Sequence, residues 1–404
     1  MTGAGTSRTV TLDALRGLGA LLVLVSHVGF WSGATREGVV GGLMARGDVG
    51  VALFFALSAF LLGRPLLARI LDLTPREWSV SRYVTHRVAR ILPAYYLALA
   101  AVIVAAVVIG GSASAPLDLA TVLTHLVVGQ GWTGQTFQSF TQTWSLTTEV
   151  TFYLLLPLVL LPLGVAMRPV SPRRRGQVLL AGFAVLAAVG LLAQAVAVAV
   201  GPGRWAGVLA SSALGHGAWF AVGLATALLR LDPALVPRRL RPAAATIMAS
   251  PGTAAATAAL VLVVASTGLA GPRDLAPPTV LEAVLKESVY ALFAGLLLAA
   301  ALGRGVDDAL TRSRLGGVAR VLGDLSYGIF LWHVLVIQVV FAVLGLPLFQ
   351  TSGGWLLVLV LVLTLLLATL SWRLVERPVL SWARRGEGLA HHRAPLQDPS
   401  PTSR

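Results

Sequence analysis

The chain alternates between long apolar stretches and short polar segments that hold most of its charges. A helix that crosses a bilayer needs about 20 mainly apolar residues. The first apolar stretch carries Asp13 and Arg16 at its start and has no small-residue cleavage site after it, so we expect a span and not a signal peptide. Ten stretches predict membrane-spanning helices: 11–31, 49–69, 91–110, 145–166, 177–200, 205–229, 252–270, 280–303, 318–345 and 354–376.

The other segments predict tails, loops and one short surface helix. Residues 1–10 form an N-terminal tail and residues 11–380 form one membrane domain. Residues 381–404 are rich in His, Pro, Ser and Arg, which predicts a disordered cytoplasmic tail. The segment 111–143 is almost uncharged, and its stretch Leu117–Val128 predicts a helix lying at the membrane surface.

Composition excludes a soluble enzyme. Hydrophobic residues make up 56% of the 404 residues and charged residues only 12%, whereas soluble domains carry about 25% charge. So few polar residues cannot cover a water-facing surface, and the predicted fold class is an all-α polytopic membrane protein in a lipid bilayer. The absence of Cys excludes disulfides, thiolate catalysis and Cys-ligated zinc.

The net charge of +14 is arranged as in a membrane protein and not as in a nucleic-acid-binding protein. Lys and Arg lie in short clusters between the apolar stretches. Of the 31, 26 fall on one side of the predicted topology and 5 on the other. Since positively charged loops face the cytoplasm, we expect both termini there and the segments 32–48 and 111–143 outside.

Ionisable residues inside spans cost about 2.5–3.5 kcal/mol each at the bilayer centre, so each needs an explanation. Arg16 and His27 are eleven residues apart, which places them on one helix face about 16 Å apart along the axis. We interpret His27 as a candidate general base in the outer half of the first span. The alternative is an interfacial arginine and a histidine that only packs between helices.

Two further groups predict binding and catalysis. Arg87 and Arg90 share a helix face at the cytoplasmic start of the third span, where two guanidinium groups would suit a polyphosphate. The alternative is ordinary positive-inside anchoring. Glu149 opens the fourth span, toward the outer face, where it could orient and stabilise the imidazole of His27. Its alternative is a first-turn carboxylate that complements the helix dipole.

Other polar residues in or beside the spans are candidates for supporting roles. His333 and Ser326 share a face, although a buried histidine is also compatible with simple packing. We expect Glu376 to pair with an arginine at the inner face, and Lys286 to pair with Glu287. No cluster of metal ligands is apparent, so no metal is predicted. The supporting candidates are Asp48, Ser58, Trp144, Ser326, His333 and Glu376.

Taken together, these residues resemble the membrane acyltransferase-3 family of sugar O-acyltransferases. Each motif alone is weak, but six in family order, each at the matching span, are highly specific. The second-span motif departs from the usual Ser-Gly-Phe, because Ala59 stands in the glycine position. The motifs are LDALRGLGALLVLVSH (12–27), GVALFFALSAFLL (50–62), RVARILPAYY (87–96), TWSLTTEVTFYLLLPL (143–158), LGDLSYGIFLWH (322–333) and WRLVERP (372–378).

The resemblance implies a ten-span protein of the bacterial cytoplasmic membrane. Its activity would be transfer of an acyl group, often acetyl, from cytoplasmic acyl-CoA to a hydroxyl of a carbohydrate, glycolipid or glycoside. It implies functional roles for Arg16, His27, Arg87, Arg90 and Glu149. Direct transfer and an acyl-histidine intermediate both remain open. The alternative function is a proton-coupled permease, since ten spans with buried charge would also suit transport.

Overall fold

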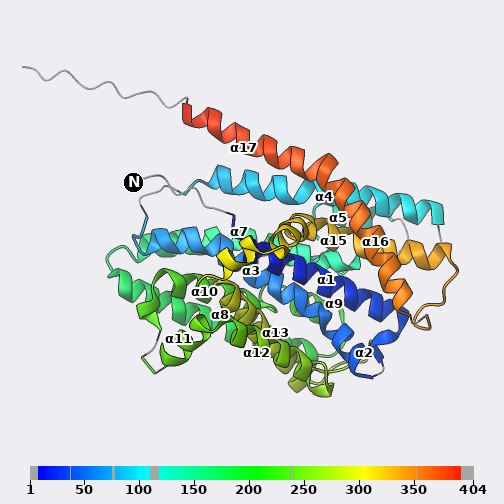
Figure 1. Cartoon of the computed structure of the whole chain (residues 1–404), viewed down its shortest axis with the longest axis horizontal. Coiled ribbons are helices and arrows are strands. Elements are labelled where there is room, and N and C mark those ends of the chain that lie inside the picture. Colours follow the sequence, from blue (N-terminus) through cyan, green and yellow to red (C-terminus); the bar gives the residue numbers. More distant parts are fainter. Residues whose placement is uncertain are drawn as a thin grey trace, which may run out of the picture.

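The computed structural model describes residues 8–36, 38–74, 78–109, 118–236, 238–239, 241–351 and 353–392. Within these ranges the chain forms helices and no strand (Figure 1), which confirms the predicted all-α polytopic fold. The α-helices are α1 (Val10–Ser32), α2 (Gly38–Ala45), α3 (Val49–Ile70), α4 (Val80–Ile109), α5 (Leu119–Leu126), α6 (Gln130–Thr133), α7 (Trp144–Ala166), α8 (Pro172–Ala199), α9 (Arg204–Ser211), α10 (Gly217–Leu231), α11 (Arg241–Ala249), α12 (Pro251–Ala265), α13 (Val280–Ala301), α14 (Val306–Arg312), α15 (Leu315–Val343), α16 (Gly354–Ser371) and α17 (Arg377–His392).

The ten predicted spans correspond to eight long helical segments and two short helices among the described residues. The eight long segments are apolar enough to cross a membrane, while α10 and α12 have 15 residues each. A helix of that length reaches about 22 Å, less than the roughly 30 Å of a hydrocarbon core. Neighbouring parts of the chain must therefore shield the ends of α10 and α12 from the lipid.

The span predicted at 205–229 is divided in the structure. Residues 212–216 separate α9 from α10, so only the second part is a long apolar helix. The side-chain amide of Gln194 in α8 donates to the carbonyl oxygens of Ala210 at 2.9 Å and Gly215 at 3.0 Å. These bonds satisfy backbone groups that the break would leave without partners in a medium that holds little water.

Two helices extend beyond their predicted bounds. α4 begins at Val80, well before the predicted residue 91, so Arg87 and Arg90 lie inside the helix and not at its entrance. α17 continues to His392, into the tail 381–404 that was expected to be disordered. Residues 393–404 lie outside the described residues.

The predicted surface helix is present as α5, although Leu117 lies outside the described residues. Asp118 caps this helix by accepting a bond from the Thr121 backbone N–H at 2.7 Å, which lowers the pKa of the Asp118 carboxyl. His125 ties α5 to α4, since the Tyr95 hydroxyl lies 3.2 Å from its Nδ1. Burial lowers the pKa of His125 to about 4, so this imidazole is neutral at physiological pH.

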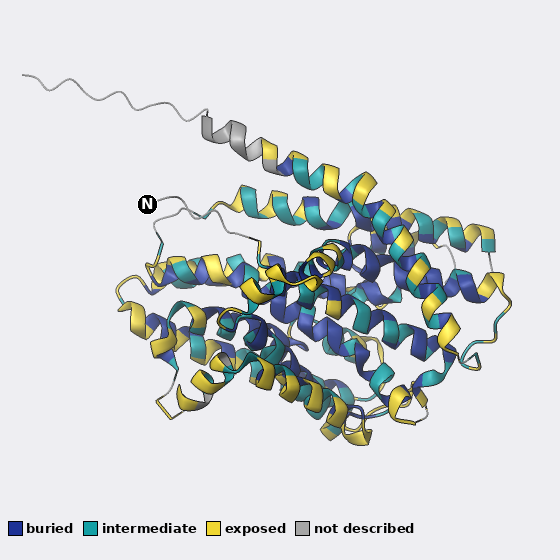
Figure 2. Ribbon diagram, viewed as in Figure 1, coloured by how far each residue is buried: buried dark blue, intermediate teal, exposed yellow. Residues whose placement is uncertain are grey.

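The centre of the bundle is formed by α1, α3 and α15, which appear mainly as buried ribbon in Figure 2. In the apolar part of α15, 78% of the residues are buried, against 39% or less in the five other long segments outside these three. Those segments, which include α4, α7 and α8, keep apolar surface for the lipid. Helix α10 also packs against α3.

Glycine residues determine how closely the helices of the bundle approach one another. A methyl group at Gly17 in α1 would lie 2.6 Å from the Leu322 Cβ, so only glycine allows α1 to approach α15 at this point. In α10, a methyl group at Gly223 would lie 2.1 Å from the Ala56 carbonyl oxygen and 2.8 Å from the Ala59 Cβ. The space missing at Ala59, where the family motif has glycine, is therefore supplied by Gly223 on the neighbouring helix.

The contact at Gly223 gives a stability prediction. We expect Gly223→Ala to lower the melting temperature of the purified protein, because its new methyl group meets backbone, and overpacking costs about 1–3 kcal/mol. Gly182→Ala in α8 is the matched control, since nothing lies within 4 Å of the new methyl group. A variant at Gly223 as stable as the control would contradict the close approach of α3 and α10.

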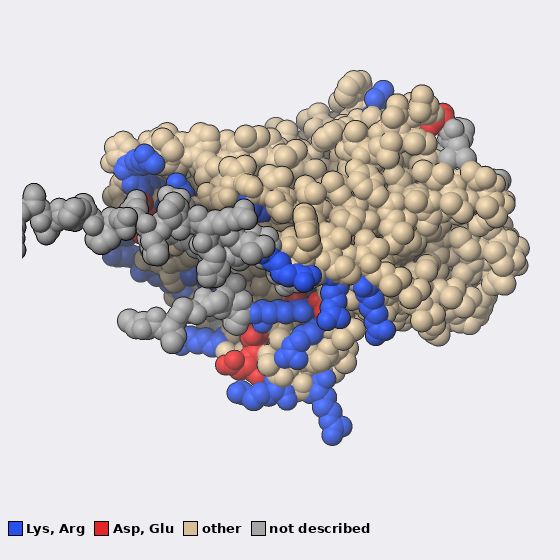
Figure 3. Space-filling model, turned by 90° about the horizontal axis from the view of Figure 1, so that it is seen from above, with Lys and Arg blue, Asp and Glu red and all other residues tan. Residues whose placement is uncertain are grey.

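Charge is distributed unevenly over the surface. Figure 3 shows most Lys and Arg of the displayed face gathered toward one end, beside a broad area without charged residues. This arrangement agrees with the uneven loop charges in the sequence. The orientation of the termini stays a prediction.

The orientation can be tested by labelling, because the chain has no native Cys. Single cysteines at Ala120, Arg173 and Arg385 report on α5, the start of α8 and the C-terminal helix. We expect an impermeant maleimide to label only the Ala120→Cys protein in intact cells, and all three after lysis. Labelling of Arg173→Cys or Arg385→Cys before lysis would invert the topology.

Candidate active site

A pocket of about 810 Å³, including its open part, lies among α1, α3, α4, α7 and α15. We call it the arginine pocket, because Arg16, Arg87 and Arg90 all line it. The central helices thus bring together groups that are up to 310 positions apart in the sequence. The predicted residues that line this pocket are Arg16, Ser58, Arg87, Arg90, Glu149 and Ser326.

The two arginines of α4 each lie over an aromatic ring. The Arg87 Cζ is 5.7 Å from the ring centre of Tyr153, and the Arg90 Cζ is 5.8 Å from that of Tyr327. Such cation–π contacts hold a guanidinium in place and leave N–H groups for a ligand. Arg87 also has a buried Nε without a hydrogen-bond partner among the described residues, which leaves the group ready to bind an acceptor.

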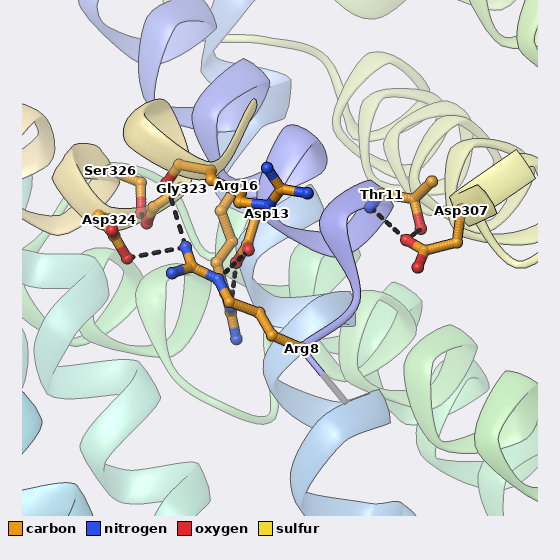
Figure 4. Close-up of polar contacts among 9 residues, drawn as sticks. Arg8, Thr11, Asp13, Arg16, Asp307, Gly323, Asp324 and Ser326 are labelled. Atoms are coloured by element: carbon orange, nitrogen blue, oxygen red, sulfur yellow. Dashed lines mark hydrogen bonds and ion pairs between the residues drawn. The ribbon is translucent and has the colours of Figure 1, made fainter. Parts of the chain in front are cut away.

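Arg16 is held by residues at the N-terminal end of α1 (Figure 4). Asp13, which is buried, accepts a bond from the Arg16 Nη1 at 3.1 Å and a second, charge-assisted bond from the Arg8 Nε. Arg8 also binds Asp324 in α15 at 2.7 Å. Sequence analysis did not assign Asp13 a role, although its spacing of three residues from Arg16 was the available signal.

Glu149 lies in the arginine pocket. Its Oε1 accepts hydrogen bonds from the hydroxyls of Ser58 and Tyr153, which are themselves 3.2 Å apart. Tyr153 follows Glu149 by one helical turn, a spacing that could have suggested the pair from the sequence. The carboxylate therefore shares a pocket with the guanidinium groups and is fixed by two hydroxyls.

His27 meets His333, on α15. The two rings lie 4.9 Å apart between centres, with the His333 Nε2 at 3.3 Å from the His27 Nδ1. Each Nδ1 also lies near a helix carbonyl, that of Val23 at 2.9 Å for His27 and that of Ile329 at 3.0 Å for His333. A carbonyl only accepts, so in the neutral rings each Nδ1 carries the proton. The basic nitrogen of His27 is then its Nε2.

The expected contact between Glu149 and His27 is not formed. The hydrogen bonds of Glu149 go to α3 and α7 side chains, and those of His27 go to its own helix and to His333. Neither histidine lines the arginine pocket. The partner of His27 is thus a second histidine, which the sequence placed only among supporting candidates.

Lys286 and Glu287, the expected pair, contact other residues instead. One of these residues is Asp48. Asp48 forms an ion pair with Lys286 at 2.7 Å and accepts a bond from the Tyr290 hydroxyl. Glu287 binds the His216 Nδ1 at 3.2 Å. The predicted Lys286–Glu287 pair is therefore wrong, because neighbouring residues on a helix point in directions about 100° apart.

The remaining candidates have structural contacts. Glu376 is buried and accepts a bond from Ser371 at 3.1 Å; within the described part of the chain no ion pair joins it to an arginine. The ring of Trp144 packs 5.3 Å from that of His216. In the described ranges no group of three or more His, Asp or Glu side chains is placed to hold a metal ion.

The fold defines a polytopic membrane protein with an internal pocket that is lined by three arginines. The acyltransferase domain model of the acyltransferase-3 family matches residues 10–373, and the chain belongs to this family. Nodulation protein 10 of Rhizobium leguminosarum bv. viciae is 26% identical, over 91% of this chain and 92% of its own. A putative membrane-bound transacylase of Komagataeibacter xylinus, BcsY, is 28% identical, over 96% and 87%. No solved structure matches the chain.

The protein is therefore an integral-membrane O-acyltransferase with several membrane-spanning helices. Membership of the family decides between the two functions left open by the sequence, in favour of the enzyme over the permease. The six resemblance motifs all fall in or beside the central helices or the arginine pocket, which gives the family match a physical basis.

The Glu149–Tyr153 contact predicts non-additive kinetics. We expect Glu149→Gln and Tyr153→Phe each to lower kcat/KM for consumption of the acyl donor. Bonds to charged groups are worth about 1.5–3 kcal/mol, so the double variant should lose little more than one single variant.

The control pair is Glu149→Gln with His333→Asn. These residues share no partner among the described contacts, so their effects on kcat/KM should add. Additive losses for Glu149 with Tyr153, or strong coupling of Glu149 to His333, would contradict the observed division between the pocket and the histidine pair.

Proposed function

We propose that this acyltransferase transfers an acyl group, acetyl in the simplest case, from acyl-CoA to a hydroxyl of a carbohydrate or glycoconjugate. The observation that carries the proposal is the convergence of Arg16, Arg87 and Arg90 on one internal pocket. Coenzyme A carries phosphate groups, and guanidinium groups bind phosphates through charge-assisted, bidentate hydrogen bonds. A carbohydrate, glycolipid or glycoside acceptor is inferred from the family resemblance.

The arginine pocket suits an anionic donor in two respects. Arg16 is paired with Asp13, but within the described part of the chain neither Arg87 nor Arg90 forms an ion pair, so a phosphate would supply the α4 arginines with an anionic partner. The buried Nε of Arg87 lacks a hydrogen-bond partner among the described residues, and a phosphate oxygen would supply one. Both features are costly in an apolar bundle unless a ligand completes them.

The histidine pair suits the transfer step. In the neutral pair the His27 Nε2 holds a lone pair, while the His333 Nε2 accepts from the His27 Nδ1. We infer that His27 takes the proton of the acceptor hydroxyl as its oxygen attacks the thioester carbonyl. The C–S bond then breaks, and the proton goes to the departing thiolate of coenzyme A. An acyl-histidine intermediate on the same nitrogen is the second possible route.

The arrangement also supports transfer across the bilayer. Arg16 and His27 lie on one helix about 16 Å apart along its axis. With the termini in the cytoplasm, the arginine pocket would open to the donor, and His27 would lie toward an acceptor that enters from outside. We expect the enzyme to lie in a bacterial cytoplasmic membrane, as the family resemblance implies.

Donor binding is tested at the two arginines of α4. Arg87→Ala and Arg90→Ala should each raise the Kd for coenzyme A at least about tenfold, because a charge-assisted contact is worth about 1.5–3 kcal/mol. Lysine should restore binding only in part, since it lacks the bidentate fork. Arg312→Ala, which removes an exposed positive charge on α14, is the control. If the Arg87/Arg90 double variant binds coenzyme A as wild type does, the donor site is refuted and both residues serve only as positively charged membrane anchors.

Catalysis is tested at His27. We expect His27→Ala to reduce acyl transfer by about 10²–10⁴-fold, the usual contribution of a general base, while the Kd for coenzyme A and the melting temperature stay near wild type. Mass spectrometry of acid-quenched protein then separates the two routes, because only an acyl-histidine adds the acyl mass to His27. Near-normal turnover of a well-folded variant would refute the assignment.

A further inference from the structure

Two phenylalanines form part of the lining of the arginine pocket. On α3, Phe54 lies one turn before Ser58, and on α15, Phe330 lies one turn after Ser326; all four residues line the pocket. His333 follows Phe330 by three residues and does not line it. Along α15 the order is therefore polar pocket, phenylalanine, then histidine.

The Phe330 ring lies between the pocket and the histidine pair, and it contacts the ring of Phe54. Their centres are 6.4 Å apart at an interplanar angle of 69°, an edge-to-face contact. On its other side, the Phe330 ring lies 6.2 Å from the ring of His333, which contacts His27. One layer of aromatic side chains thus separates the donor pocket from the proposed base.

Phe54 also contacts α1. It packs against α1 at Gly19, where an added methyl group would lie 3.4 Å from the Phe54 ring. Glycine at this point leaves the ring room against the helix. Phe54 is only partly buried, so its ring borders open space.

We propose that Phe54 and Phe330 form a constriction through which the acyl group reaches His27, and that this constriction selects short acyl chains. The proposal rests on the proposed function, because it takes the arginine pocket as the site of coenzyme A. The phosphates would stay with the arginines, and the thioester would pass between the rings. Both phenylalanines are specificity-determining residues in this account.

The geometry explains the preference for short chains. His333 lies three positions after Phe330 on α15, a rise of about 4.5 Å along the helix axis. The ring centres of Phe330 and His333 are only 6.2 Å apart and His333 is fully buried, so a long acyl chain must displace the rings or neighbouring helices. Closed rings also keep water from the thioester until the acyl group has entered, which limits hydrolysis.

The experiment compares Phe54→Ala and Phe330→Ala with wild type in the purified full-length protein. Coenzyme A, acetyl-CoA and hexanoyl-CoA are the probes. Calorimetry gives their Kd values, and release of free thiol without acceptor gives kcat/KM for thioester hydrolysis, in which water forms the new C–O bond as the C–S bond breaks. Phe183→Ala, a buried phenylalanine of α8 that does not line the pocket, is the control.

We expect both variants to raise the hexanoyl-to-acetyl ratio of kcat/KM at least about tenfold, since even one methylene in a pocket changes this ratio about 10–200-fold. The Kd for coenzyme A itself should stay within about twofold of wild type, and the control should resemble wild type. Phe330→Leu keeps an apolar wall and should give an intermediate ratio, which guards against misfolding of the alanine variants.

Two failures are distinguishable. If coenzyme A binds and Arg87→Ala weakens it, but the chain-length ratio is unchanged in every phenylalanine variant, the constriction is refuted and the donor site stands. If coenzyme A shows no binding that depends on Arg87, the proposed function falls, and the constriction falls with it.

Discussion

Helices α1 and α15 lie far apart in the sequence, and their close approach positions both the arginine pocket and the histidine pair. At Gly17 and Gly323 the absence of a side chain lets the helices meet, since a methyl group at Gly323 would lie 2.5 Å from the Asp13 Cβ. The same contact brings Arg16 beside the pocket and His27 against His333. A larger residue at either glycine would separate the helices and disturb both regions together.

The second constraint is electrostatic. Guanidinium groups in an apolar bundle need partners, and the protein supplies only some of them. Arg16 has Asp13, while Arg87 and Arg90 rest on aromatic rings and share the pocket with Glu149. The site therefore retains positive charge that an anionic donor can compensate. The packing of the apolar central helices offsets the free-energy cost of burying these guanidinium groups.

The sequence was sufficient for the fold class and for much of the pocket. Apolar length predicts spans directly, and helix spacing predicted that Arg87 and Arg90 would act from one face. It could not show that Glu149 bonds to Ser58 or that His27 meets His333, because contacts between distant helices depend on packing and not on local pattern. The break at residues 212–216 was missed for the same reason, since the amide that stabilises it comes from another helix.

The most direct test of this account is a cryo-electron microscopy structure with a non-hydrolysable thioether analogue of acetyl-CoA. We predict phosphate density against Arg87 and Arg90, and the acyl group between Phe54 and Phe330, directed at the His27 Nε2. Density for the analogue at another site, with the arginine pocket unchanged and His27 remote from the acyl carbon, would contradict the account.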